Sequence, residues 1–158
     1  QDWTSKSMAD TLAGALAFFR YAKEKGVAVF YITNREEAER EGTAVNLKKY
    51  GFPEPDKDHL LLRAGTSSKE ARRQSVAANH TILLLLGDNL ADFSADFDKK
   101  QLMERQANTL KSASLFGTRY IILPNPFYGD WEGSAFKYNY SLTPLQKDSV
   151  IKGLVKSY

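Results

Sequence analysis

The sequence predicts an α/β fold, in which a parallel sheet is covered by helices on both faces. Short, wholly apolar runs such as residues 27–32 and 81–86 alternate with longer helix-favouring stretches, the pattern of strand–helix–strand units. The runs lack the polar alternation of strands with one solvated face, so we expect strands buried on both sides. The chain contains no internal repeat and no low-complexity segment that would favour another class.

The first half of the chain alternates two helical and two strand-like segments. Apolar residues at helical spacing predict a helix over residues 8–25, with Gly26 as its stop. The β-branched and aromatic run 27–32 predicts a buried strand. Residues 36–50 are polar and helix-favouring, and a second short strand is predicted at residues 60–62.

The second half continues the alternation. Ser67 and Ser68 can cap a helix from residue 69 to about residue 78. The most apolar strand of the chain follows at residues 81–86 and stops at Gly87. Three further segments complete the pattern: a helix over about 99–111, a strand at 120–123 and a closing helix over 143–157, with a Pro- and Gly-rich loop at 124–133 after the strand.

Length and composition predict one domain over residues 1–158. The 158 residues are 42% hydrophobic, enough for a core of ordinary size. The net charge of +3 comes from interleaved acidic and basic residues, so a nucleic acid polymer is not the expected partner. No apolar run approaches the roughly 20 residues of a membrane span. The absence of cysteine excludes disulfides and thiolate metal sites.

In parallel α/β sheets, ligands bind beyond the carboxyl ends of the strands. Thr33 and Asn34 directly follow one strand, so a hydroxyl, an amide and backbone N–H groups converge where an anion could dock. The same residues could merely cap the helix that begins near Glu36. The motif alone leaves both interpretations open.

The loop after residues 81–86 carries oxygen ligands. Asp88, Asn89 and Asp92 follow the strand closely, and hard oxygen ligands suit Mg²⁺. A carboxylate beside so apolar a strand requires a cation or strong hydrogen-bond donors nearby. The alternative is structural, with Asp88 starting a turn and Asp92 capping a helix.

Cations and histidines carry weaker signals. Lys69 opens a helix and could neutralise a phosphoryl oxygen, although most lysines at helix starts point into water. Arg72 and Arg73 are expected to form part of a solvated face, with no functional role. His59 and His80 lie apart from any Ser or Cys nucleophile pattern and are not expected to be catalytic bases.

Four segments resemble, in order along the chain, motifs of the class C bacterial acid phosphatases, which include the lipoprotein 5′-nucleotidases of the cell envelope. They are VFYITNR (29–35), SKEAR (68–72), GDNLADF (87–93) and LPNPFYGDWEG (123–133). The resemblance implies a Rossmann-like core of the haloacid dehalogenase type. It also implies an Mg²⁺-dependent phosphomonoesterase.

The resemblance implies a role for each matching residue. Thr33 and Asn34, with Arg35 beside them, would bind the substrate's phosphoryl group. Lys69 would offset charge in catalysis, Asp88 would ligate Mg²⁺, and Asp92 would support the metal from the second shell. Tyr128 would stack on a substrate ring, with Phe127 and Trp131 in the same aromatic cluster.

One departure from the family concerns the nucleophile. The superfamily carries it in an Asp-x-Asp-x-Thr or -Val motif after the first strand, and this sequence contains none; the Asp-Lys-Asp of residues 56–58 precedes its strand and does not qualify. The first Asp attacks phosphorus, and the second protonates the leaving oxygen. In the family this motif precedes the region that matches Trp3 to Gly26, so the simplest explanation is a truncation that removes the first central strand and most of the helical cap.

This explanation has structural and functional consequences. The missing strand would lie between the strands that end at Ile32 and Leu86, leaving two open edges. We therefore expect the isolated chain to fold poorly and to be inactive.

The leading hypothesis is an acid phosphatase whose substrate is a small phosphomonoester such as a nucleoside monophosphate. The enzyme would act through an aspartyl-phosphate intermediate, and the aspartate that forms it would lie upstream of this chain. The alternatives are a phosphate- or nucleotide-binding module without catalysis and a structural interaction domain. Family resemblance alone implies the bacterial cell envelope (periplasm or outer membrane), with membrane contact only through an upstream lipid anchor.

Overall fold

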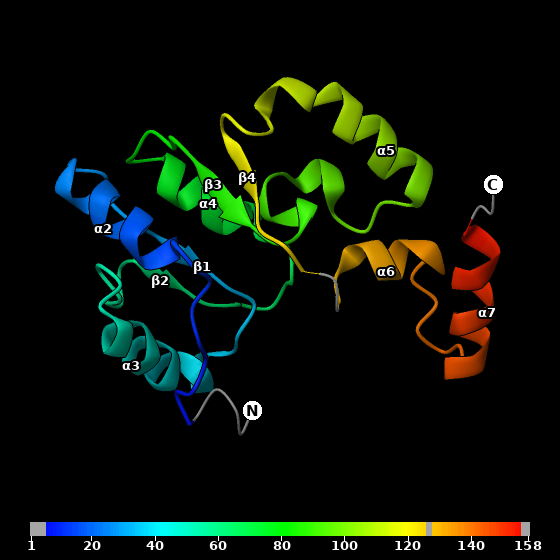
Figure 1. The fold of residues 1–158 in the computed structure, drawn as a ribbon, viewed down its shortest axis with the longest axis horizontal. Coiled ribbons are helices and arrows are strands. Elements are labelled where there is room, and N and C mark those ends of the chain that lie inside the picture. Colours follow the sequence, from blue (N-terminus) through cyan, green and yellow to red (C-terminus); the bar gives the residue numbers. More distant parts are fainter. Residues whose placement is uncertain (1–5, 126–127, 156–158) are drawn as a thin grey trace. The chain divides into compact units, whose positions relative to one another are not determined.

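The computed structural model describes residues 6–125 and 128–155, and the chain divides into two compact units, Gln1–Arg73 and Gln74–Tyr158. Helices alternate with short parallel strands along the chain (Figure 1). The predicted α/β class is therefore confirmed. The expectation of one domain stays a prediction.

The first unit contains a two-stranded parallel sheet, in which Tyr31 lies opposite Leu60 and Ile32 opposite Leu61. Its elements are α2 (Ala15–Glu24), β1 (Tyr31–Ile32), the 3-10 helix η1 (Glu37–Glu39), α3 (Arg40–Tyr50) and β2 (Leu60–Leu61), and it ends within α4 (Glu70–Ala77). Both predicted strands and the predicted helix over 36–50 are present, although the strands are shorter than expected.

The first predicted helix begins later than expected. Helix α2 starts at Ala15 rather than at residue 8, because Gly14 has a φ of +82° and breaks the helical path. Met8 and Leu12, which fit the helical periodicity, are 65% and 47% exposed. The predicted stop is confirmed, since Gly26 adopts the left-handed conformation with a φ of +77°.

Apolar and aromatic contacts hold α2 to the sheet of the first unit. The Phe19 ring lies 6.3 Å from the Tyr31 ring and 5.7 Å from the Phe52 ring. Leu60 of β2 is 1% exposed, and Val29 is 5% exposed. Each strand-like run of this unit thus contributes buried residues to the core. Tyr31 and Ile32 of β1 are only half-buried, so the prediction of a strand buried on both faces is wrong here.

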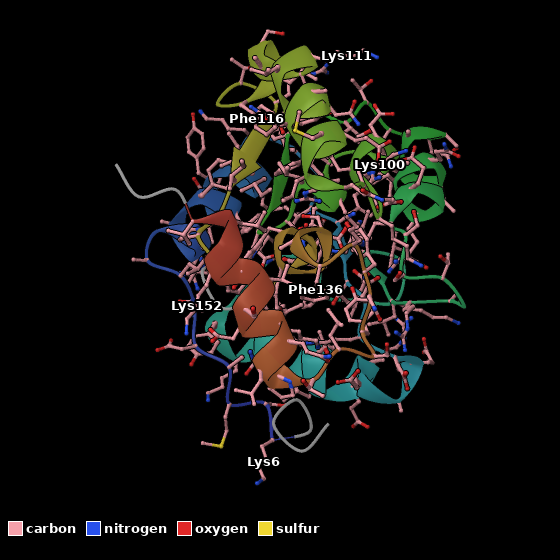
Figure 2. All side chains as sticks on the ribbon, turned by 90° about the vertical axis from the view of Figure 1, so that its right-hand side faces the viewer. Lys6, Lys100, Lys111, Phe116, Phe136 and Lys152 are labelled. Atoms are coloured by element: carbon pink, nitrogen blue, oxygen red, sulfur yellow. The ribbon has the colours of Figure 1, made fainter. Side chains whose placement is uncertain are left out.

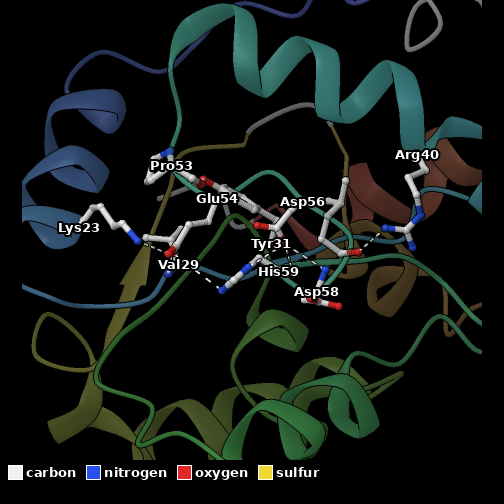
Figure 3. A network of polar contacts seen from close by, with 10 residues as sticks. Lys23, Val29, Tyr31, Arg40, Pro53, Glu54, Asp56, Asp58 and His59 are labelled. Atoms are coloured by element: carbon white, nitrogen blue, oxygen red, sulfur yellow. Dashed lines mark hydrogen bonds and ion pairs between the residues drawn. The ribbon is translucent and has the colours of Figure 1, made fainter.

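A polar network around Glu54 ties α2 to the segment before β1 (Figure 3). The Glu54 carboxylate accepts hydrogen bonds from the Lys23 ammonium and from the backbone N–H of Val29. His59 lies beside it, with Nε2 4.0 Å from Glu54 Oε2 and Nδ1 2.8 Å from Asp56 Oδ1. The Lys23 hydrogen bond is the main cause of a lowered pKa of Glu54, and the Val29 N–H and the charges of Lys23 and His59 add to it.

This network predicts an acid-sensitive first unit. Because the pKa of Glu54 is lowered below 4.5 in the folded chain, its stabilisation is complete above pH 4.5 and is lost as pH falls through the lower, folded value. We expect wild type to lose more thermal stability between pH 6 and pH 3 than Glu54→Gln, when melting is followed in both proteins. Glu41→Gln, at an exposed position of α3, is the matched control and should behave as wild type. Equal acid sensitivity in all three proteins would contradict the prediction.

The second unit contains the other two-stranded parallel sheet, in which Leu85 lies opposite Tyr120 and Gly87 opposite Ile122. Beyond the rest of α4, it comprises β3 (Leu85–Gly87), the 3-10 helices η2 (Leu90–Asp92), η3 (Ala95–Phe97) and η4 (Ala113–Leu115), α5 (Leu102–Lys111), β4 (Tyr120–Ile122), α6 (Asp130–Ala135) and α7 (Pro144–Leu154). The predicted loop over 124–133 is wrong in its last part, because Asp130 starts α6. Gly129, with a φ of +151°, is the residue before that helix.

Aromatic side chains form the core of the second unit. Phe97 is 0% exposed and Phe93 is 3% exposed. The Phe93 ring stacks on Tyr120 of β4 at 4.9 Å, and Phe116 meets both rings edge-on. Figure 2 labels Phe116 and also Phe136, whose ring meets the Tyr140 ring edge-on at 5.7 Å. These contacts place β4 beside the turn that follows β3, the turn that carries Asp88 and Asp92.

Among the described residues, β1 pairs only with β2, and β3 pairs only with β4. Each of the two strands that precede predicted site loops therefore has one edge without a partner strand in that part of the chain. This agrees with the expectation of two open edges. The strand that would cover them and the poor folding of the isolated chain stay predictions. No helix in the described part of the chain has the length and apolar character needed to cross a membrane.

Candidate active site

The loop after β1 carries Thr33, Asn34 and Arg35, and backbone hydrogen bonds fix it beside β2. The N–H of Thr33 donates to Leu61 O at 3.0 Å, and the N–H of Arg63 donates to Arg35 O at 3.0 Å. The Thr33 hydroxyl oxygen accepts a hydrogen bond from the N–H of Arg35 at 3.3 Å. The hydroxyl and backbone groups of this loop are thus held at the carboxyl end of β1, where the sequence predicts an anion site.

The side chains of Asn34 and Arg35 point to different elements. Asn34 Nδ2 donates to Ser67 O at 2.9 Å, so the amide faces the segment that leads into α4. Arg35 Nη1 donates to the hydroxyl of Thr43 in α3 at 2.9 Å. Neither Thr33 nor Asn34 caps the following helix, because the residue before η1 is Glu36, whose N–H donates to Glu39 Oε2 at 2.8 Å.

Helix α4 begins directly after Lys69. The Ser68 hydroxyl accepts a hydrogen bond from the N–H of Glu70 at 3.3 Å, and the carbonyl of Lys69 accepts one from the N–H of Arg73 at 3.0 Å. The predicted serine cap is therefore confirmed. The predicted solvated face is wrong, since Arg73 is 5% exposed and pairs with Glu70.

In the second unit, the turn after β3 is closed by Asp92. The N–H of Asn89 donates to Asp92 Oδ2 at 3.1 Å, and the N–H of Asp92 donates to Asn89 O at 2.9 Å. Gly87 allows this turn, because a Cβ at that position would lie 2.5 Å from both Cβ and Oδ2 of Asp92. Asp92 therefore shapes the loop that presents Asp88, whose carboxylate is exposed.

Asn125 joins Asp88 to the loop after β4. Its Nδ2 donates to Asp88 Oδ2 at 2.6 Å, while its Oδ1 accepts a hydrogen bond from the N–H of Tyr128 at 3.4 Å. The indole N–H of Trp131 donates to Tyr128 O at 3.2 Å, and Tyr128 is 67% exposed. The predicted metal ligand and the predicted ring-stacking residue thus share one amide partner. Phe127, the third member of the predicted aromatic cluster, lies outside the described residues.

The order of these loops along the chain agrees with one known family. Residues 1–131 match the model of the HAD superfamily, subfamily IIIB (Acid phosphatase). The chain belongs to this acid phosphatase family. The resemblance drawn from its four motifs is therefore confirmed.

Two solved structures of the class C acid phosphatase from Bacillus anthracis are similar to this member of the acid phosphatase family, and one of them has tungstate bound. Each is 39% identical, with a TM-score of 0.95 over 99% of this chain. The chain spans 66% of the length of each of these relatives.

HAD acid phosphatases generally use a divalent metal ion, and the turn after β3 in this family member offers oxygen donors that fit one. Asp88 is an exposed carboxylate, and Asn89 Oδ1 is a buried oxygen on the same turn. Residues 6–125 and 128–155 contain no group of three His, Cys, Asp or Glu side chains able to hold a metal. The described part of the chain thus supplies some of the oxygen ligands that a divalent metal site needs, but not a complete set.

Sequence reasoning missed two polar residues that hold the predicted site residues of this family member. Arg72 donates to Asn34 Oδ1 at 2.7 Å, and Asn125 donates to Asp88 at 2.6 Å. The sequence held a signal for each: Arg72 is one helical turn after Ser68, and Asn125 follows a strand end. Thr33 lies in the first unit and Asp88 in the second, and their meeting in one pocket stays a prediction.

Proposed function

We propose that the complete protein is a magnesium-dependent phosphatase that hydrolyses small phosphomonoesters, with nucleoside monophosphates as the preferred class. The observation that carries the proposal is the exposed Asp88 carboxylate at the end of β3, held by Asn125 in a chain of the acid phosphatase family. The 39% identity to a class C acid phosphatase supports the reaction class. The tungstate bound by that relative supports an oxyanion pocket, because tungstate is a tetrahedral oxyanion like phosphate.

In this proposal, the loops at the strand ends bind the phosphoryl group and the metal ion. The Thr33 hydroxyl and the backbone N–H of Asn34 bind phosphoryl oxygens, and the Lys69 ammonium offsets their charge. Asp88 holds Mg²⁺, and Asp92 keeps the turn in place through its bond to the N–H of Asn89. When bound, the metal neutralises charge on the phosphoryl group. The nucleophile is an aspartate upstream of this chain that forms an aspartyl-phosphate.

Substrate recognition is proposed to use the loop after β4. The exposed ring of Tyr128 offers an apolar face to a nucleobase, and the indole hydrogen bond from Trp131 to Tyr128 O holds the backbone beneath it. Stacking recognises any base through its ring face and therefore favours nucleotides as a class over one particular base. We further propose, from the family alone, that the protein acts in the bacterial cell envelope.

The decisive experiment assays the complete gene product with p-nitrophenyl phosphate and with a nucleoside monophosphate, before and after chelation of divalent metal. We expect hydrolysis of both, loss of activity with chelator and recovery when Mg²⁺ is added back. Binding of inorganic phosphate without turnover in any preparation would instead establish the non-catalytic module. Turnover that survives exhaustive chelation would contradict the metal requirement.

A further inference from the structure

Arg72 contacts both loops of the first unit that carry predicted phosphate-binding groups. Its Nη1 donates to Thr33 O, and its Nη2 donates to Asn34 Oδ1 at 2.7 Å and to Ser68 O at 3.0 Å. The first two acceptors lie at the end of β1. The third acceptor is the carbonyl oxygen of Ser68, the residue before Lys69. One guanidinium therefore fixes the loop after β1 against the start of α4.

These bonds also set the orientation of the Asn34 amide. Oδ1 accepts from Arg72, while Nδ2 donates to Ser67 O at 2.9 Å. The amide thus bridges α4's guanidinium and the segment before α4. The carbonyl oxygen of Thr33 accepts a hydrogen bond from the same guanidinium. Because a peptide group is planar, this bond also fixes the direction of the Asn34 N–H.

The chemistry requires arginine. A planar guanidinium presents several N–H donors in fixed directions and can reach three acceptors at once, whereas a lysine ammonium is a compact charge on a flexible stem. Partial burial, followed by the charges of Arg73 and Arg63, lowers the pKa of Arg72. Three arginines therefore lie near the predicted anion site, and the guanidinium of Arg72 still donates its three hydrogen bonds there.

We propose that Arg72 is a positioning residue of the phosphate site: it aligns Thr33 and Asn34 with Lys69 before substrate binds. This inference rests on the proposed function. Pre-organisation of this kind affects rate, because a displacement of about 1 Å in a positioned group can cost about 100-fold.

The test compares Arg72→Ala and Arg72→Lys with Arg20→Ala in the complete protein. Arg20 is a matched control, because its guanidinium also joins two segments through carbonyls, those of Tyr50 and Gly51, but touches no predicted site residue. For Arg72→Ala we expect kcat/KM to fall about 10- to 100-fold and amide hydrogen exchange at residues 33–35 to accelerate. Free guanidinium, well below denaturing concentrations, should restore part of the activity. Arg72→Lys should remain impaired, and Arg20→Ala should stay within about 3-fold of wild type, the spread expected for a change that shifts no reacting group.

The outcomes separate this inference from the function on which it rests. If wild type is an active phosphatase but Arg72→Ala matches Arg20→Ala in kcat/KM, or leaves exchange at residues 33–35 unchanged, the positioning role is overturned. If wild type hydrolyses no phosphomonoester, the proposed function fails. Binding of inorganic phosphate then decides the role of Arg72: weaker binding in Arg72→Ala supports it, and equal or absent binding overturns it.

Discussion

Asp88→Asn in the complete protein is expected to lower kcat/KM for p-nitrophenyl phosphate at least about 100-fold. Losing an outer-shell partner of a metal ligand costs roughly 10- to 100-fold, and Asp88 is proposed as a direct ligand. The substitution keeps the size of the side chain and an oxygen that can still accept the hydrogen bond from Asn125 Nδ2. The expected loss therefore comes from the missing charge. Affinity for Mg²⁺, measured by titration calorimetry, should weaken together with activity.

Asp148→Asn is the matched control for this prediction. Asp148 is an exposed aspartate of α7 that pairs with Lys152 at 2.7 Å, far along the sequence from any predicted site residue. The same chemical change there removes one surface ion pair, which typically contributes about 0–1 kcal/mol. Activity and Mg²⁺ affinity should both remain near wild type. Hydrolysis by Asp88→Asn at the rate of this control would refute the assignment of the metal ligand.

Gly87→Ala is expected to destabilise the second unit by about 1–3 kcal/mol, the usual cost of forcing an added carbon into a packed site. The new methyl group would lie 2.5 Å from Cβ and Oδ2 and 2.8 Å from Cγ of Asp92. Asp92 would have to move, and its hydrogen bond from the N–H of Asn89 would be lost or weakened. Because that turn presents Asp88, activity should fall as well. Thermal melting and kcat/KM measure the two effects.

Gly153→Ala provides the comparison for Gly87→Ala. Gly153 lies in α7, and a Cβ there would meet nothing within 4 Å. Alanine is favoured over glycine by up to about 1 kcal/mol in a helix interior, and Gly153 lies in the last turn of α7, so this variant should be as stable as wild type or slightly more so. If Gly87→Ala melts at the same temperature as Gly153→Ala, the packing argument at the end of β3 is wrong.

Local patterns predicted most of the secondary structure. The apolar runs produced β1 to β4, and Ser68 caps α4 through Glu70 N as its position indicated. These features depend on residues a few positions apart, whose preferences act in any surroundings. The strands are nevertheless much shorter than the runs. A strand extends only where a neighbour supplies hydrogen bonds, and β1 and β3 each have one partner strand in the described part of the chain.

Long-range contacts explain what the sequence left open at the site. The polar residues at the strand ends were identifiable from sequence, because the carboxyl ends of parallel strands are where such folds bind ligands. Arg72 was assigned to a solvated face because its neighbours along the helix are also charged. Its partner Thr33 is 39 residues away, and Asn125 is 37 residues from Asp88.

The sequence by itself determined the α/β class, the family, the order of the site loops and the residue types at the strand ends, because periodicity and motif spacing are properties of the chain alone. Only the tertiary structure decided why Gly87 admits no side chain and which polar groups hold Thr33, Asn34 and Asp88. Those outcomes depend on atoms brought together by folding, and a hydrogen bond or a steric limit exists only once both partners are in place.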